Sequence, residues 1–158
     1  MSVTILEDTR QQAGKHETKH AWFNDHNVTL YRSKLPFGDY APVPPVAVDT
    51  KKDMEEICMD ICGKEHRRFI DEVKSARDAG CKLYVLVEND VGIDGLEGVS
   101  GWTNPRVIYN PKCPQGPQLH KAMQTISERY GCTFLFCRPD QSAEIISKIL
   151  GIEYEQST

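Results

Sequence analysis

Three aspartates and a lysine stand out because each lies at or just after the end of an expected strand: Asp8, Asp39, Asp49 and Lys51. Asp49 and Lys51 are two residues apart, so in a strand both side chains point to the same face. Carboxylate oxygens are the ligands that Mg²⁺ and Mn²⁺ prefer, and such a cation polarises a phosphate and lowers the pKa of bound water. A lysine beside them can orient that water or stabilise developing charge. This combination fits metal-assisted hydrolysis of a phosphodiester bond.

The pattern itself is short, with Asp39 ten residues before Asp49 and Lys51 two residues after it. Many soluble proteins contain the same spacing by chance, on a surface strand whose charges are solvated. On spacing alone both interpretations stand, and the surrounding elements have to decide between them.

The elements that would position these residues alternate between strands and helices. Short apolar runs predict strands, and 3.6-residue periodicity predicts helices. The strands are expected at Val3–Leu6, Val28–Tyr31, Gly38–Tyr40, Val46–Asp49, Lys82–Glu88 and Cys132–Cys137, and a further helix pattern ends at Gly151. This order predicts an α/β fold with a mixed central sheet covered by helices on both faces.

The helix that follows Lys51 has the clearest start signal. Asp53 and Glu56 form a capping-box pattern, and an apolar stripe then runs to Cys62 before Gly63. A second helix is expected over Lys64–Ala79, and Gly116 begins another. Residues 89–116 are rich in Gly, Pro and Asn, which is typical of a functional or mobile loop; we expect its Trp102 segment to pack over one sheet edge.

Composition excludes several classes of protein. The chain has 158 residues, 39% of them hydrophobic, and a formal net charge of −4, which suits one domain and does not indicate a strongly basic nucleic-acid binder. No apolar run is long enough for a membrane span, and the N-terminus lacks a secretory pattern, so a cytoplasmic protein is expected. Six cysteines without a CxxC pair favour reduced, buried thiols over zinc, and His16 and His20 are interpreted as solvated.

Five ordered motifs resemble the ERCC4-type nuclease domain, as in the XPF family, within the PD-(D/E)xK superfamily. They are Ile5–Arg10, Gly38–Tyr40, Val48–Lys52, Arg68–Glu72 and Lys82–Glu88. Three later segments are similar to the C-terminal part of short stand-alone members from bacterial mobile elements and phages: Trp102–Arg106, Leu119–Ile126 and Arg129–Cys137. The resemblance implies a restriction-endonuclease-like sheet, in a single domain over residues 1–158 with a catalytic core over about 3–90 and C-terminal elements over about 100–152.

The resemblance also implies roles for individual residues. Asp8, Asp39, Asp49 and Lys51 take the catalytic positions, and the three aspartates with the Thr50 backbone carbonyl would bind Mg²⁺ or Mn²⁺. The sequence departs from the family pattern at three positions: Asp49 replaces a glutamate, Thr50 an arginine and Gln11 a glutamate. These departures leave the generic (D/E)-x-K motif in place.

Residues around this set are candidates for supporting roles. The acid after the lysine is Glu55 by strict count, or Asp53 by its place at the helix start. Arg68 and Glu72 are implied to face the site, although a surface ion pair four residues apart explains them equally. The candidate DNA-binding side chains are those of Arg10, Lys52, Arg67 and Arg68.

The resulting hypothesis is a metal-dependent endodeoxyribonuclease that prefers flap, fork or branched DNA, in repair, recombination or phage replication within a bacterial or phage-infected cell. The structure preference follows from the resemblance alone. The alternative is a catalytically inactive nuclease fold that binds DNA or acts as a scaffold. DNA is the expected partner, no membrane is involved, and the choice between DNA and RNA, the number of metal ions and a homodimer remain open.

Overall fold

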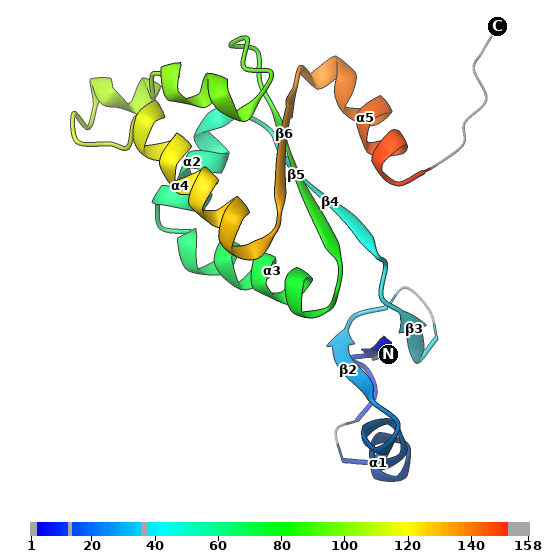
Figure 1. Ribbon diagram of the computed structural model, residues 1–158. Helices are drawn as coiled ribbons and strands as arrows, with labels where there is room; N and C mark the ends of the chain where they lie inside the picture. The colour runs from blue at the N-terminus through cyan, green and yellow to red at the C-terminus, as the bar shows by residue number, and fades with distance from the viewer. Residues whose placement is uncertain (1–2, 13, 36–37, 152–158) are drawn as a thin grey trace, which may run out of the picture. The chain divides into compact units, whose positions relative to one another are not determined.

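The computed structural model describes residues 3–12, 14–35 and 38–151 (Figure 1). Contacts along the backbone divide the chain into two compact units. Unit 1 comprises Met1–Pro45 with Ala79–Cys81, and unit 2 comprises Val46–Asp78 with Lys82–Thr158. Each unit contains its own three-stranded sheet.

Unit 1 is built around strand β1, Val3–Asp8, which lies between two other strands. It runs parallel to β2, Val28–Ser33, and antiparallel to β3, Tyr40–Pro42. A parallel pair needs a crossover connection, and α1, Glu17–Asp25, supplies it. In this register Asp8 lies opposite Ser33, so the chemistry-bearing end of β1 coincides with the end of β2.

Unit 2 contains a fully parallel sheet with the strand order β4-β5-β6. The strands are β4, Val46–Lys51; β5, Lys82–Glu88; and β6, Thr133–Cys137. Leu86 and its neighbours Val85 and Val87 on central strand β5 are fully buried, as expected where helices cover both faces.

Four helices cover this sheet: α2, Met54–Cys62; α3, His66–Asp78; α4, Gly116–Tyr130; and α5, Ser142–Ile149. Figure 1 shows α2, α3 and α4 on one face and α5 on the other. The first three lie within the two crossovers of consecutive parallel strands, and right-handed crossovers in one direction place their helices on the same face. The apolar stripe of α2 (Met54, Ile57, Cys58, Ile61) belongs to the resulting core.

The start of α2 follows the sequence prediction closely. The Asp53 side chain accepts a hydrogen bond of 2.8 Å from the Glu56 backbone N–H, and the helix ends before Gly63. This cap fixes where α2 begins relative to β4, two residues after Lys51.

The segment between β5 and α4 is ordered around two short 3₁₀ helices, Leu96–Gly101 and Pro105–Ile108. Val99 and Trp102 are buried in the core, and the first 3₁₀ helix contacts both α4 and the edge strand β6. The expected packing of the Trp102 segment over a sheet edge stays a prediction. Gly116 is required here, because a Cβ would lie 2.5 Å from the backbone oxygens of Val99 and Trp102. The segment therefore serves as a packed support for α4.

The α/β class and the helices on both sheet faces are confirmed, but the strands form two sheets where one mixed central sheet was expected. The separation follows Pro42, Pro44 and Pro45, which cannot donate ladder hydrogen bonds and interrupt the chain between β3 and β4. The single-domain division stays a prediction, and its boundary near residue 152 lies outside the described residues. Within those residues, no helix is both long and apolar enough to cross a membrane.

Candidate functional site

Asp49 and Lys51 point from one face of β4 into a cavity of about 420 Å³ in unit 2. Among the described residues, β4 pairs with β5 alone and so is an edge strand, and α2 and α3 supply the other walls of the cavity. The cavity is lined by Asp49, Lys51, Glu56, Asp60, Glu65, Arg68, Phe69 and Glu72. The predicted i, i+2 placement of the aspartate and the lysine is therefore present, and Arg68 and Glu72 of α3 join them as the resemblance implied.

Lys51 lies between two carboxylates. Its Nζ is 2.7 Å from Oδ2 of Asp60 and 3.0 Å from Oδ2 of Asp49, and 5.7 Å from the ring centroid of Phe69. The Lys51 side chain is only 12% exposed. Burial alone would lower the pKa of Lys51, but the hydrogen bonds and charges of Asp60 and Asp49 outweigh it and raise that pKa. The ammonium group is therefore charged throughout the physiological range.

Carboxylates outnumber cationic groups around this cavity, since five acidic side chains face Lys51 and Arg68. The pKa of Glu72 reflects this excess of negative charge. Burial raises that pKa, the negative charges of Asp49 and Asp60 raise it further, and the nearby cations oppose the change. A cavity with this charge attracts cations and repels a phosphate that arrives without one.

The oxygen donors fit a hard divalent cation in their chemistry. Apart from the Lys51 ammonium, Oδ2 of Asp49 and Oδ2 of Asp60 have no hydrogen-bond donor among the described residues, although both are buried. In residues 3–12, 14–35 and 38–151, no group of three or more His, Cys, Asp or Glu side chains is arranged to hold a metal ion. Mg²⁺ is commonly bound through one or two carboxylates together with waters and substrate phosphate oxygens, so the donors of this cavity suit that ion.

The other two predicted aspartates, Asp8 and Asp39, lie together in unit 1. They line a hollow of about 490 Å³ with Arg10, Gln11, Gln12, Lys15, His16 and Gly38. The backbone N–H of Asp8 donates to the Asp39 carbonyl at 2.8 Å, and the Asp39 residue is exposed. Because Asp49 and Lys51 belong to unit 2, the assembly of all four residues into one centre stays a prediction.

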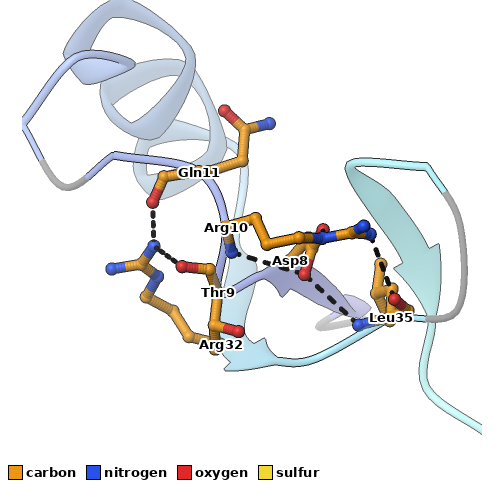
Figure 2. A network of polar contacts seen from close by, with 6 residues as sticks. All are labelled: Asp8, Thr9, Arg10, Gln11, Arg32 and Leu35. Carbon is orange, nitrogen blue, oxygen red and sulfur yellow. Dashed lines mark hydrogen bonds and ion pairs between the residues drawn. The ribbon is translucent and has the colours of Figure 1, made fainter.

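The Asp8 carboxylate is fully engaged within unit 1, as Figure 2 shows. One oxygen accepts the backbone N–H groups of Leu35 (3.3 Å) and Arg10 (3.4 Å), and the other pairs with the Arg10 guanidinium, which also donates to the Leu35 carbonyl at 3.1 Å. Burial would raise the pKa of Asp8, but the hydrogen bonds from Leu35 and Arg10 lower it. These contacts hold the end of β1 to the segment after β2, so a metal-binding role for Asp8 remains a prediction.

A second buried carboxylate in unit 1, that of Glu7, was not anticipated from the sequence. Its oxygens lie 2.6 Å from His20 Nε2 and 3.4 Å from Arg32 Nε. The interpretation of His20 as solvated is therefore wrong, because this side chain ties α1 to β1. Strict alternation along β1 would have left either Glu7 or Asp8 facing solvent, so periodicity gave no signal for the pair.

Several predicted residues lie away from the unit 2 cavity. Asp53 serves as the cap of α2, and Glu55 is 3.7 Å from Arg106 beside a neighbouring hollow of about 320 Å³ that Lys52 also lines. Arg67 is exposed on α3, and Thr50 is exposed on β4. Of the two candidates for the acid after the lysine, neither contacts Lys51; Asp60 does.

Asp60 lies nine residues after Lys51, so its proximity to the lysine could not be predicted from sequence distance. The helical period offered a usable signal, since Glu56 and Asp60 are four residues apart and lie on one face of α2 beside the apolar stripe. Because α2 begins soon after β4 and packs back against it, a residue such as Asp60 can lie beside the face of β4 that carries Lys51.

Comparison with known proteins gives a match at the level of structure. No protein-family model matches the chain, and no curated protein sequence matches it. The chain is similar to XPF from Aeropyrum pernix in complex with DNA (14% identity, TM-score 0.48, 95% of this chain and 64% of that chain). It is also similar to XPF from Aeropyrum pernix (16% identity, TM-score 0.48, 93% and 63%), so it spans slightly less than two thirds of each matched chain. These structures are of the family that the sequence motifs resemble.

Proposed function

We propose that this protein is a metal-dependent endonuclease that hydrolyses phosphodiester bonds in DNA. The observation that carries the proposal is the pairing of Asp49 with Lys51 on one face of β4, in a cavity whose carboxylates outnumber its cations. A solvated surface strand would leave both side chains exposed, whereas Lys51 is 12% and Asp49 24% exposed.

The cavity residues divide the chemistry between binding a cation and handling negative charge. Asp49 would hold Mg²⁺ or Mn²⁺, with Asp39, Asp8 and the Thr50 carbonyl as the further ligands that the family resemblance implies. When bound, such an ion polarises a phosphate and lowers the pKa of a coordinated water. Lys51, held in its charged form, is suited to stabilise the negative charge that develops on the phosphate oxygens, or to orient the attacking water.

The charge of the cavity also supports metal dependence. A phosphodiester that approaches five carboxylates is repelled unless a cation compensates them. Arg68 lies on the cavity wall, and we assign it, with Lys52, Arg67 and Arg10, to contacts with the DNA backbone. Phosphate contacts of this kind position the nucleic acid without reading its sequence.

The finer assignments rest on the motif resemblance. They are a preference for flap, fork or branched DNA, a role in repair or recombination, and an origin in a phage or mobile element. We include a homodimer in the proposal.

One observation favours the alternative, an inactive nuclease fold that binds DNA or acts as a scaffold. Lys51 already pairs with both Asp49 and Asp60, and Asp8 is engaged by Arg10 and Leu35. If these contacts persist in solution, the chain would bind DNA without cleaving it.

Cleavage assays distinguish the two functions. Labelled duplex, flap, fork and single-stranded DNA are incubated with the wild type, Lys51→Ala and the control Lys121→Ala, in Mg²⁺, Mn²⁺ or EDTA. We expect cleavage that requires the metal, is lost in Lys51→Ala and is retained in Lys121→Ala, because Lys121 is exposed on α4 outside the cavity. Binding without cleavage in either metal would support the inactive fold, and cleavage that EDTA does not affect would contradict the proposal.

A further inference from the structure

Asp60 makes the shortest ion pair in the unit 2 cavity. Its Oδ2 lies 2.7 Å from Lys51 Nζ, closer than the 3.0 Å between that nitrogen and Asp49. The side chain is 15% exposed and comes from α2, not from the strand that carries the other two residues. The lysine is therefore held from two different elements.

The Asp60 carboxylate pairs with Lys51. Its Oδ2 is buried and has no hydrogen-bond donor among the described residues other than the Lys51 ammonium. A buried carboxylate is costly unless it is paired, and here the lysine is the partner that compensates it. Removal of Asp60 would leave Lys51 beside the Phe69 ring with a single paired carboxylate among the described residues, that of Asp49 on the same strand.

We propose that Asp60 is a positioning residue that fixes the Lys51 ammonium beside Asp49 at the wall of the cavity. A lysine side chain is long and flexible, and a single contact leaves it many rotamers. Asp60, Asp49 and the Phe69 ring together surround the ammonium and restrict it to one place. The functional part of this inference rests on the proposed nuclease function, in which Lys51 acts on the phosphate.

Three other acidic residues near the start of α2 do not pair with Lys51 in the described structure. Asp53 is occupied by the N-terminal backbone of α2, and Glu55 pairs with Arg106. Glu56 lines the same cavity one helical turn before Asp60, but its side chain makes no ion pair with Lys51 among the described residues. Glu56 therefore offers a control of the same charge on the same helix face.

The first part of the test is independent of DNA and of metal. Heteronuclear NMR spectra at one pH record the Nζ ammonium groups, and a lysine held by two carboxylates gives a slowly exchanging signal. We expect the Lys51 signal to be lost in Asp60→Asn, retained in Glu56→Gln, and restored at least in part in Asp60→Glu. A Lys51 signal that is unchanged in Asp60→Asn would overturn the proposal.

The second part measures steady-state cleavage with Mg²⁺ for the same Asp60 variants and for Asp71→Asn, an exposed acid of α3 outside the cavity. A misplaced catalytic group costs on the order of 100-fold in rate, so we expect kcat to fall about 100-fold in Asp60→Asn with KM nearly unchanged. Partial recovery is expected in Asp60→Glu and no change in Asp71→Asn. Circular dichroism and thermal unfolding establish that each variant is folded.

The outcomes separate this inference from the function on which it builds. If Asp60→Asn loses the Lys51 signal while kcat is unchanged, Asp60 is not a positioning residue for the reaction. If the wild type cleaves no substrate, the proposed function fails, and the NMR comparison still decides whether Asp60 fixes Lys51.

Discussion

The acidic and basic groups around Asp8 in unit 1 and those around Lys51 in unit 2 differ in how their charges are satisfied. In unit 1, Asp8 is buried and both of its oxygens are occupied, by backbone N–H groups and by the Arg10 guanidinium. In unit 2, Asp49 and Asp60 share the single ammonium of Lys51 at the wall of a cavity that contains further carboxylates. The first cluster is saturated, and the second has an excess of negative charge.

This difference distinguishes a carboxylate that stabilises the fold from one that is able to bind a ligand. A carboxylate that accepts several hydrogen bonds within the chain has to exchange some of them before it can bind a metal ion, and its removal lowers the stability of the fold. A carboxylate that shares its counter-charge in an open cavity can exchange that partner for a cation or a substrate group. Similar motif positions therefore lead to opposite expectations for the two units.

The largest effect is expected from Asp49→Asn. The substitution keeps the size of the side chain and removes the charge that pairs with Lys51, so we expect cleavage to fall by about 10³-fold, the scale found when a charge-stabilising group is removed from an active site. Because the residue is partly exposed at a strand end, hydrogen-exchange protection of β5 should change little. Wild-type-like cleavage by this variant would contradict the assignment of the site to unit 2.

Asp39→Asn tests whether the two units contribute to one centre. The residue is exposed in unit 1, so its replacement should leave the fold intact. If it completes the metal site with Asp49, cleavage should fall by about 10²- to 10³-fold, and Mn²⁺ affinity measured by calorimetry should fall with it. Unchanged Mn²⁺ affinity together with unchanged cleavage would leave unit 2 as the whole of the active site.

Asp8→Asn should affect stability where Asp39→Asn does not. An asparagine at position 8 has one oxygen and one NH₂ group in place of the two carboxylate oxygens. Its oxygen can accept either the Leu35 N–H or the Arg10 guanidinium, and its NH₂ group then faces the other donor. We expect hydrogen-exchange mass spectrometry to show a marked loss of protection in β1 and β2, with Asp39→Asn as the matched control in the same unit. Equal protection in both variants would mean that the Asp8 network does not support unit 1.

Acid should weaken unit 1 before unit 2. The pKa values of Asp8 and Glu7 are lowered in the folded chain: burial opposes the change, and Leu35 with Arg10, or His20 with Tyr40, outweighs it. Such groups stabilise the fold above the unfolded pKa of about 4, and the contribution is lost as pH falls through the lower folded value.

Glu72 has the opposite effect on stability. Its pKa is raised, so the folded chain binds this proton more tightly than the unfolded chain does, and protonation of Glu72 in acid favours the fold. Two-dimensional NMR spectra between about pH 6 and pH 2 should therefore lose the dispersed β1 amide signals at a higher pH than the β5 signals. Simultaneous loss of both sets would show that the two units unfold together.

Local patterns predicted the elements well, because each depends on residues close in sequence. The cap at Asp53 and the buried run of β5 follow from a capping box and an apolar stretch. The division into two sheets depends on how the proline-interrupted segment after β3 leaves the first sheet, and this is a matter of long-range pairing. The prolines mark the interruption after β3, but they do not determine which strands pair on either side of it.

The candidate site was predictable only in part for a similar reason. The shared face of Asp49 and Lys51 follows from strand geometry, and it is present. The contact of Asp60 with Lys51 depends on how α2 packs back on β4, and the pairing of Glu7 with His20 depends on how α1 crosses the first sheet. Residues that act through tertiary packing therefore escape a search along the sequence.

The smallest effect is expected from Asp53→Ala, which tests how far the unit 2 cluster depends on the helix that carries Asp60. The substitution removes the hydrogen bond to the Glu56 N–H and should lower the free energy of unfolding by about 1 kcal/mol, measured by urea denaturation. Asp53→Ser retains a capping oxygen and should recover most of that loss. Because α2 is also anchored by its buried apolar stripe, the Lys51–Asp60 pair should survive, and the Lys51 ammonium signal should remain in both variants. Its loss in Asp53→Ala alone would mean that the cap, and not only the packing of α2, determines where Asp60 meets the lysine.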